Sequence, residues 1–177
     1  MIRSILGGLA FAVVLAAPGA ADAQSAAKAK PDTAAIVRRL MAGANFATLV
    51  TLDETGAPRS RTVQPKAPEA DFSVWIATNP KTRKVSDIAR DGRVVLHYFD
   101  PKRMGYVSIA GKARVVRDRA EKAAHWDKAW DSFYPDKENG AVLIGVTPDR
   151  MEIVSDKDGI TGDKATWRPP VWTAKKR

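Results

Sequence analysis

The chain has 177 residues and a formal net charge of +9, from 29 lysines and arginines against 20 acidic residues. It contains no cysteine, which excludes disulfides, a thiolate nucleophile and cysteine-ligated zinc. The excess of positive charge favours anionic partners without naming one. Because the basic residues are spread along the chain, with a short cluster only at its end, we expect no nucleic-acid partner.

The first 23 residues have the three parts of a secretory signal peptide. Arg3 supplies a positive start, residues 5–15 are apolar, and Ala21-Asp22-Ala23 is a small-x-small cleavage site. The apolar run is shorter than the roughly 20 residues that a membrane-spanning helix needs. We therefore predict an exported, periplasmic protein with no stable membrane insertion after cleavage, and a linker over residues 24–31.

Short helices and strands follow the linker in alternation. Helical spacing of apolar residues after an Asp32 cap predicts a first helix that stops at Gly43. A hairpin turn over 53–56 joins the first two strands, and Gly111 is expected to bend or bulge a long strand. Two further helices are expected over 81–90 and 119–132. The segments with strand patterning are 46–52, 59–65, 72–77, 93–99, 105–116, 141–146 and 151–154.

Six to seven short strands, mostly in hairpin order, predict an α+β chain dominated by β-structure. The architecture that fits is an antiparallel barrel over residues 32–156 with short flanking helices, followed by a basic tail over 157–177. No glycine-rich dinucleotide motif or P-loop is present. The two histidines have no convergent carboxylates, so we predict no metal site, and no residue pattern identifies a catalytic group.

The run from Thr78 to Lys84, T-N-P-K-T-R-K, follows an apolar strand and opens an amphipathic helix. Backbone N–H groups at a helix start, the Thr82 hydroxyl and the cations of Arg83 and Lys84 are groups that bind a phosphate monoester. Cations in the first turn are opposed by the helix dipole unless an anion joins them. The alternative is a solvated charged face, which a charge run at a helix start more often forms. The cations placed against the dipole, together with the order of the motifs described below, favour a phosphate site.

A basic strand lies upstream of that run. Strand alternation places Arg59, Arg61 and Val63 on one face, and the Arg61 guanidinium is suited to bonding two phosphate oxygens at once. The alternative is an exposed edge strand protected by charge. Together, the two segments predict the two sides of one phosphate site.

Three short motifs follow one another along these segments: Arg61-Thr62-Val63, Thr78-Asn79 and Thr82-Arg83-Lys84. Their order and spacing resemble the FMN-binding split-barrel proteins of the pyridoxamine 5′-phosphate oxidase superfamily. The later run Y-V-S-I-A-G, over 106–111, is similar to the general stress protein branch. The resemblance implies an antiparallel split β-barrel that binds FMN at the interface of a homodimer.

The resemblance also implies which residues bind the cofactor. Arg61 is expected to contact the FMN phosphate. The residues after it are expected along the flavin ring or ribityl chain: Thr62, Val63 and Gln64. The second segment supplies the remaining cofactor-binding residues: Thr78, Asn79, Thr82, Arg83 and Lys84.

The implied activity is flavin-dependent redox chemistry on a small molecule that the sequence does not identify. Pyridoxamine phosphate oxidases read their substrate with a C-terminal Arg/His motif, which is not evident in residues 163–172, so we do not expect that reaction. One alternative is a non-catalytic stress protein that binds flavin or another anionic cofactor such as haem. Another is a basic protein that adheres to envelope surfaces by charge alone.

Overall fold

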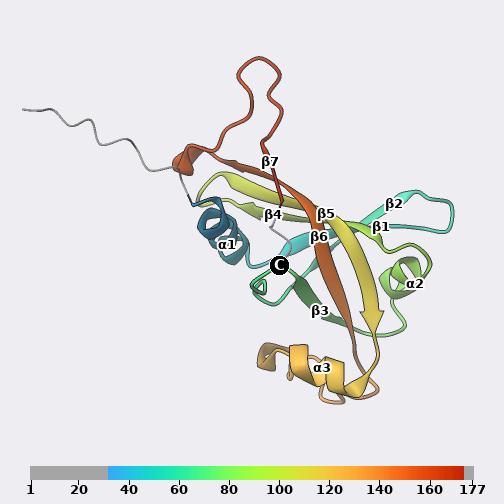
Figure 1. Ribbon diagram of the computed structural model, residues 1–177. Helices are drawn as coiled ribbons and strands as arrows, with labels where there is room; N and C mark the ends of the chain where they lie inside the picture. Colours follow the sequence, from blue (N-terminus) through green and yellow to red (C-terminus); the bar gives the residue numbers. More distant parts are fainter. Residues whose placement is uncertain (1–31, 174–177) are drawn as a thin grey trace, which may run out of the picture. The chain divides into compact units, whose positions relative to one another are not determined.

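The computed structural model describes residues 32–173, and within them every strand pairing is antiparallel in one seven-stranded sheet (Figure 1). The strand order is β2-β1-β4-β5-β6-β3, and β7 pairs with β6. The predicted signal peptide and linker, residues 1–31, lie outside the described residues. Among residues 32–173, no helix has the length and apolar character needed to cross a bilayer.

The elements alternate along the chain much as the sequence predicts. The helices are α1 Thr33–Ala44, α2 Arg83–Arg90 and α3 Arg119–His125, with short 3₁₀ turns at Lys128–Trp130 and Asp156–Asp158. The strands are β1 Ala47–Leu52, β2 Pro58–Val63, β3 Val74–Thr78, β4 Arg93–Asp100, β5 Gly105–Val116, β6 Val142–Ser155 and β7 Val171–Trp172.

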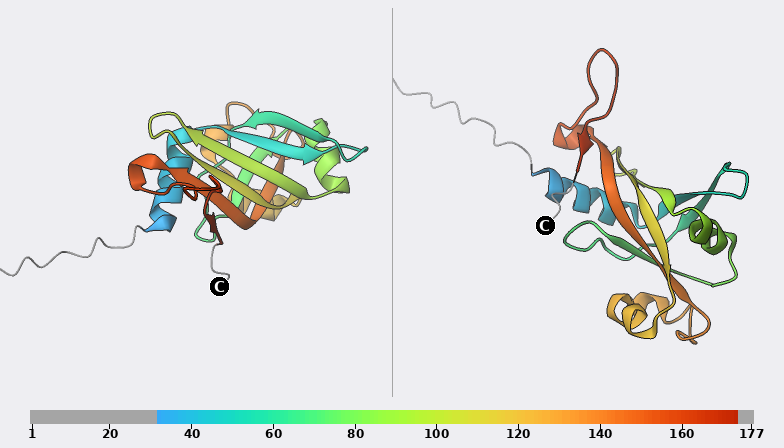
Figure 2. Two further views of the ribbon diagram at one scale, coloured as in Figure 1. Left: turned by 90° about the horizontal axis from the view of Figure 1, so that it is seen from above. Right: turned by 45° about the vertical axis from the view of Figure 1, so that its right-hand side comes forward.

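The sheet curls into a split barrel, with β2 and β3 at the two ends of the main strand order. The segment that connects β2 to β3 is hydrogen-bonded to β3 itself: the N–H of Lys66 donates to the Trp75 carbonyl at 2.9 Å. Helices α1 and α2 lie at opposite ends of the barrel in both figures (Figures 1 and 2). The predicted α+β class and antiparallel barrel are confirmed.

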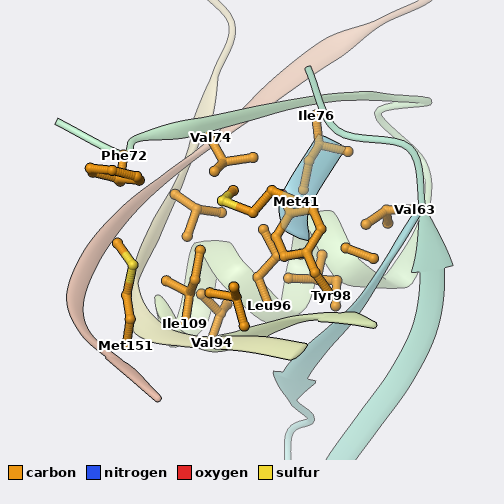
Figure 3. Packing of buried hydrophobic residues seen from close by; sticks show 14 of the residues in the cluster. Met41, Val63, Phe72, Val74, Ile76, Val94, Leu96, Tyr98, Ile109 and Met151 are labelled. Atoms are coloured by element: carbon orange, nitrogen blue, oxygen red, sulfur yellow. The ribbon is translucent and has the colours of Figure 1, made fainter. Parts of the chain in front are cut away.

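Alternate residues of the strands point inward and form one main core (Figure 3). On β4, for example, Val94, Leu96 and Tyr98 are buried, while the residues between them are half-buried or exposed. Helix α1 adds Leu40 and Met41 to the same core. Burial of these apolar side chains is the main force that closes the barrel.

The prediction that Gly43 stops the first helix is wrong. Helix α1 continues through Gly43 and ends at Ala44, and the C-cap residue Asn45 has a φ of 57°. A Cβ added at Gly43 would lie 2.2 Å from Oδ2 of Asp100, a carboxylate with only 2% of its residue surface exposed. The glycine is therefore required by a close approach between helix and strand, and its place near the helix end is incidental.

The two strands expected over 141–146 and 151–154 form one continuous strand, β6. Pro148 does not end the strand, because it lies opposite Gly111 at a register shift between Ala110 and Gly111. The shift skips Asp149, so the extra residue is absorbed as a bulge. The predicted irregularity at Gly111 is confirmed, and the bulge explains how a proline fits inside a long strand.

The helix expected over 119–132 ends early, at His125. The Asp127 carboxylate accepts the backbone N–H of Ala129 at 2.9 Å and starts a 3₁₀ turn in place of further α-helix. Residues beyond 156 also join the sheet, because β7 pairs with Met151 and Glu152, and the Trp172 ring meets Phe72 edge-on at 5.0 Å. Two residues are too few to show strand patterning in the sequence.

We expect Gly43→Ala to lower stability, although alanine in place of glycine stabilises an ordinary helix interior. The new methyl group would clash with the buried Asp100 carboxylate, and overpacking of this kind costs roughly 1–3 kcal/mol. The free energy of unfolding, from urea denaturation, measures the effect. Ala42→Gly on the exposed neighbouring position is the control for intrinsic helix propensity, and a higher midpoint for Gly43→Ala would contradict the close contact.

Candidate functional site

Strand β2 presents its basic side chains on the inner face of the sheet. Arg59 and Arg61 are half-buried and Val63 is buried, whereas Ser60 and Thr62 between them are exposed. This is the alternation that the sequence predicts. Because β2 is an end strand, its inward cations lie at the rim of the barrel and not in the apolar core.

Arg61 is held in place by groups of the barrel itself. Its Nη1 donates to Oγ1 of Thr51 at 2.7 Å and to the Leu49 carbonyl at 3.3 Å. Thr51 in turn donates its hydroxyl to Oδ2 of Asp87 at 2.8 Å, and Arg61 Nη2 lies 3.5 Å from the same oxygen. The guanidinium is thus oriented by a buried hydroxyl and a buried carboxylate.

Asp87 is the counter-ion of this corner of the molecule. Its side chain is 1% exposed and lies on α2, one turn after Arg83. Besides Arg61, its Oδ1 lies 3.7 Å from Arg59 and 3.4 Å from Arg90. This carboxylate therefore faces three guanidinium groups, and Arg59 also pairs with Asp53 at 3.2 Å and Glu54 at 3.3 Å. The local charge stays positive because Arg83 and Lys84 lie at the same corner.

The start of α2 completes the cationic corner. Thr82 is the N-cap residue, but its hydroxyl donates to the Asn79 carbonyl at 3.0 Å and makes no capping bond to the helix. The Asn79 side chain accepts the N–H of Lys81 at 2.8 Å. The turn is thereby fixed, and the first N–H groups of α2 have no side-chain cap.

These elements enclose a hollow of about 630 Å³, which we call the basic hollow. Its lining comes from β2 and from the start of α2: Arg59, Ser60, Arg61, Thr82, Arg83 and Lys84. Burial, and then the nearby Arg61 charge, lower the pKa of Lys84. Burial also lowers the pKa of Arg61, with Asp87 opposing and Arg83 and Arg59 adding to the effect. An anion in the hollow relieves this repulsion.

A second hollow of about 200 Å³, the ring pocket, adjoins the first and shares Lys84 with it. One wall comes from the end of β2 and from β3 and mixes polar with apolar side chains: Thr62, Val63, Gln64, Ile76, Ala77 and Thr78. The other wall is aromatic and comes from the segment between α3 and β6: Trp130, Phe133 and Tyr134. The pair of hollows suits a ligand with an anionic group at one end and a flat ring at the other.

The structure brings the predicted site residues together from two segments of the chain. Arg61, Thr82, Arg83 and Lys84 line the basic hollow. Four others line the ring pocket: Thr62, Val63, Gln64 and Thr78. Asn79 lines neither of these two hollows and instead shapes the turn before Thr82.

Sequence reasoning missed the aromatic wall and the counter-ion. Trp130 is 5% exposed and lines the ring pocket. A signal was present, since Phe133 and Tyr134 follow it within one turn. Asp87 gave a weaker signal, because an acidic residue inside a basic helix more often faces solvent.

Neither histidine of the chain belongs to the two hollows. His125 Nδ1 lies 2.7 Å from Glu69 Oε1, and its ring stacks on Trp75 at 3.8 Å. His97 lies 5.3 Å from the Tyr106 ring, and burial lowers its pKa. Within residues 32–173, no group of three or more metal-binding side chains comes together.

The chain is similar to known proteins in sequence pattern and in fold. A family model described as pyridoxamine 5′-phosphate oxidase like matches residues 32–161. No curated protein sequence matches the chain.

Solved structures share the fold at low sequence identity. A Clostridium acetobutylicum protein related to general stress protein 26 of Bacillus subtilis has a TM-score of 0.63 at 16% identity, covering 76% of this chain and 89% of its own. A haem-binding protein from Mycobacterium smegmatis has a TM-score of 0.60 at 22% identity, and the match covers 82% of this chain and 60% of that protein. An FMN-binding protein from Nostoc punctiforme related to pyridoxamine 5′-phosphate oxidase has a TM-score of 0.54 at 14% identity, and the match covers 71% of this chain and 82% of that protein.

We expect Asp87→Asn to destabilise the chain by about 3 kcal/mol, because it removes the buried carboxylate that faces Arg59, Arg61 and Arg90. Urea denaturation measures the change. Asp91→Asn is the matched control, since Asp91 pairs with an exposed Arg93 and its loss should shift the midpoint far less. Equal effects of the two substitutions would show that Asp87 is not the counter-ion of this cluster.

Proposed function

We propose that this chain, which belongs to the pyridoxamine 5′-phosphate oxidase-like family, binds FMN across the basic hollow and the ring pocket. The observation that carries the proposal is the junction of the two hollows at Lys84. A cationic site and an aromatic site that share one residue are suited to the phosphate and the ring of a single ligand.

The residues of the site fit the two ends of FMN. A phosphate of charge near −2 pairs with the guanidinium groups of Arg61 and Arg83 and with the Lys84 ammonium, while the uncapped backbone N–H groups at the start of α2 offer neutral donors. The Thr82 hydroxyl would join them by exchanging its bond to the Asn79 carbonyl for one to the phosphate. The lowered pKa of Lys84 supports this assignment, because its causes are burial and a neighbouring cation. A bound phosphate dianion would offset the Arg61 charge, which is one of the two causes that lower this pKa.

The flavin ring is assigned to the ring pocket. Thr62, Val63 and Gln64 would lie along the ring on one side, and Trp130 and Tyr134 on the other. Phe133 remains 68% exposed at the mouth of this pocket. We propose that a second copy of the chain covers this open side, giving a homodimer with two equivalent sites.

The proposed activity is flavin-dependent oxidation or reduction of a small molecule. FMN supplies transfer of one or two electrons, and the protein binds the phosphate, orients the ring and excludes water from it. Oxidation of pyridoxamine phosphate is not proposed, because the C-terminal segment lacks the motif that would read that substrate.

Haem is the second candidate ligand, since the Mycobacterium smegmatis protein of the same fold is described as haem-binding. An imidazole is a common axial ligand of haem iron. In this chain, however, neither His97 nor His125 lines the basic hollow or the ring pocket, and the hydroxyl of Tyr134, which does line the ring pocket, donates to the Ala77 carbonyl at 3.4 Å. FMN is therefore the better match to these side chains.

Removal of Lys84 tests the phosphate assignment. We expect Lys84→Ala to weaken FMN binding by about 10- to 100-fold, the usual effect of losing a hydrogen bond to a charged group. Quenching of flavin fluorescence measures the affinity. Lys81→Ala is the control, because Lys81 is an exposed cation three residues away that does not line the hollow. Unchanged affinity in Lys84→Ala would refute the site.

Two additions to this experiment separate the candidate functions. Oxidation of NADH by the FMN-loaded protein faster than by free FMN would support an oxidoreductase, whereas tight binding without turnover would indicate a flavin-binding protein. A haem titration followed by absorbance should show weak binding that does not compete with FMN. Haem bound more tightly than FMN would favour the second candidate.

We also propose that residues 1–23 direct export and that the mature chain begins at Gln24, in the periplasm. A chain threaded unfolded through a membrane cannot carry a non-covalent cofactor, so FMN would have to bind after export. Mass spectrometry of protein recovered from the periplasmic fraction should give the mass of residues 24–177. An intact Met1 in the cytoplasmic fraction would exclude export.

A further inference from the structure

A buried phenol marks a third hollow, which neither end of FMN occupies in the proposal above. Tyr98 on β4 is 3% exposed, and its hydroxyl has no hydrogen-bond partner among residues 32–173. Burial also raises the pKa of this hydroxyl, which stays protonated. A buried hydroxyl that lacks a partner is destabilising, so its retention calls for an explanation.

The Tyr98 ring lies beside Met41 inside the barrel and lines a hollow of about 420 Å³ (Figure 3). The end of α1 forms one wall with Met41 and Asn45, and the segment after β2 forms the other with Pro65 and Lys66. This volume falls in the usual range of small-molecule sites. We call it the Tyr98 hollow.

The charges of the hollow limit what it can hold. Arg38 lines it, but its guanidinium donates to the carbonyls of Pro68, Glu69 and Ala70 at 2.9–3.0 Å and is committed to the protein. Within the described residues, the Lys66 ammonium has no ion pair or hydrogen bond. Among the described residues, Lys66 is thus the one uncommitted cation that lines the hollow, and a single positive charge favours a monoanion over a phosphate dianion.

We propose that the Tyr98 hollow is a binding site for a monoanionic aromatic compound with a hydroxyl group. The hydroxyl would exchange a hydrogen bond with the Tyr98 phenol, the ring would pack on Met41 and Pro65, and the anionic group would meet Lys66. Nothing in the proposed FMN site uses Tyr98 or α1. The inference therefore stands or fails separately from flavin binding.

The hollow adjoins the ring pocket, because Gln64 lines both. If FMN occupies the ring pocket, the aromatic compound lies next to the flavin and becomes the candidate redox substrate. This extension, unlike the site itself, rests on the proposed function. It names a substrate class for an activity whose substrate the sequence leaves open.

Three related probes test the site on the flavin-free chain: 4-hydroxybenzoate, benzoate without the hydroxyl, and phenol without the carboxylate. We expect 4-hydroxybenzoate to bind most tightly, with backbone amide shifts in ¹H–¹⁵N NMR spectra confined to residues 41–45 and to Gln64, Lys66 and Ala67. Tyr98→Phe should weaken 4-hydroxybenzoate about five- to tenfold and leave benzoate unchanged. Lys66→Gln should weaken both carboxylates about tenfold and leave phenol unchanged.

Stability provides an independent readout of the Tyr98 hydroxyl. Because it has no partner in the described part of the chain, Tyr98→Phe should leave the urea midpoint unchanged or raise it. Tyr106→Phe is the matched control, since Tyr106 lies half-buried on the next strand and does not line the hollow, and it should not alter probe affinity. A lower midpoint for Tyr98→Phe would show that the hydroxyl is already satisfied, and would overturn the proposal.

Binding in the basic hollow is the competing outcome for an anionic probe. Lys84→Ala separates the two sites, because it weakens FMN but should leave 4-hydroxybenzoate unchanged, and inorganic phosphate should not compete with the probe. Loss of probe binding in Lys84→Ala, or equal affinities of 4-hydroxybenzoate and benzoate in the unmodified chain, would overturn the Tyr98 site. Neither result would bear on FMN binding itself.

Discussion

The buried carboxylate of Asp87 is the constraint on which the cationic corner of this barrel depends. Guanidinium groups from β2 and α2 converge there, and without a counter-ion their repulsion would separate the helix from the strands. This carboxylate aligns Arg61 through Thr51, and Asp53 and Glu54 pair with Arg59. Arg83 and Lys84 leave the corner with an excess of positive charge. The ion pairs thus hold helix α2 against the strands, and the remaining positive charge can bind an anion.

The barrel then determines what lies next to that charge. The end of β2 passes between two hollows, with Thr62, Val63 and Gln64 on the ring pocket and Gln64 to Lys66 on the Tyr98 hollow. The connection to β3, residues 64–73, is hydrogen-bonded to the barrel, and Arg38 on α1 donates to three of its carbonyls. A rigid segment between two hollows can hold two ligands in a defined relation.

The fold alone does not decide which cofactor the chain takes. Structures with this fold include one described as FMN-binding and one described as haem-binding, at identities of 14% and 22%. The side chains of the site decide which cofactor binds, because one fold can carry different binding sites. Here the side chains are cations, hydroxyls and aromatic rings without an imidazole, and that set is suited to a phosphate and a flat ring.

Local pattern was enough to predict much of this molecule. Strand alternation and hairpin order gave the antiparallel barrel and the common face of Arg59, Arg61 and Val63, because side-chain direction along a strand follows from its period. Contacts between distant segments were not readable: the approach of Gly43 to Asp100, the bulge that carries Pro148, Asp87 under the guanidinium groups and the isolated Tyr98 hydroxyl. Each depends on which strands and helices become neighbours, and that is decided only when the whole core packs.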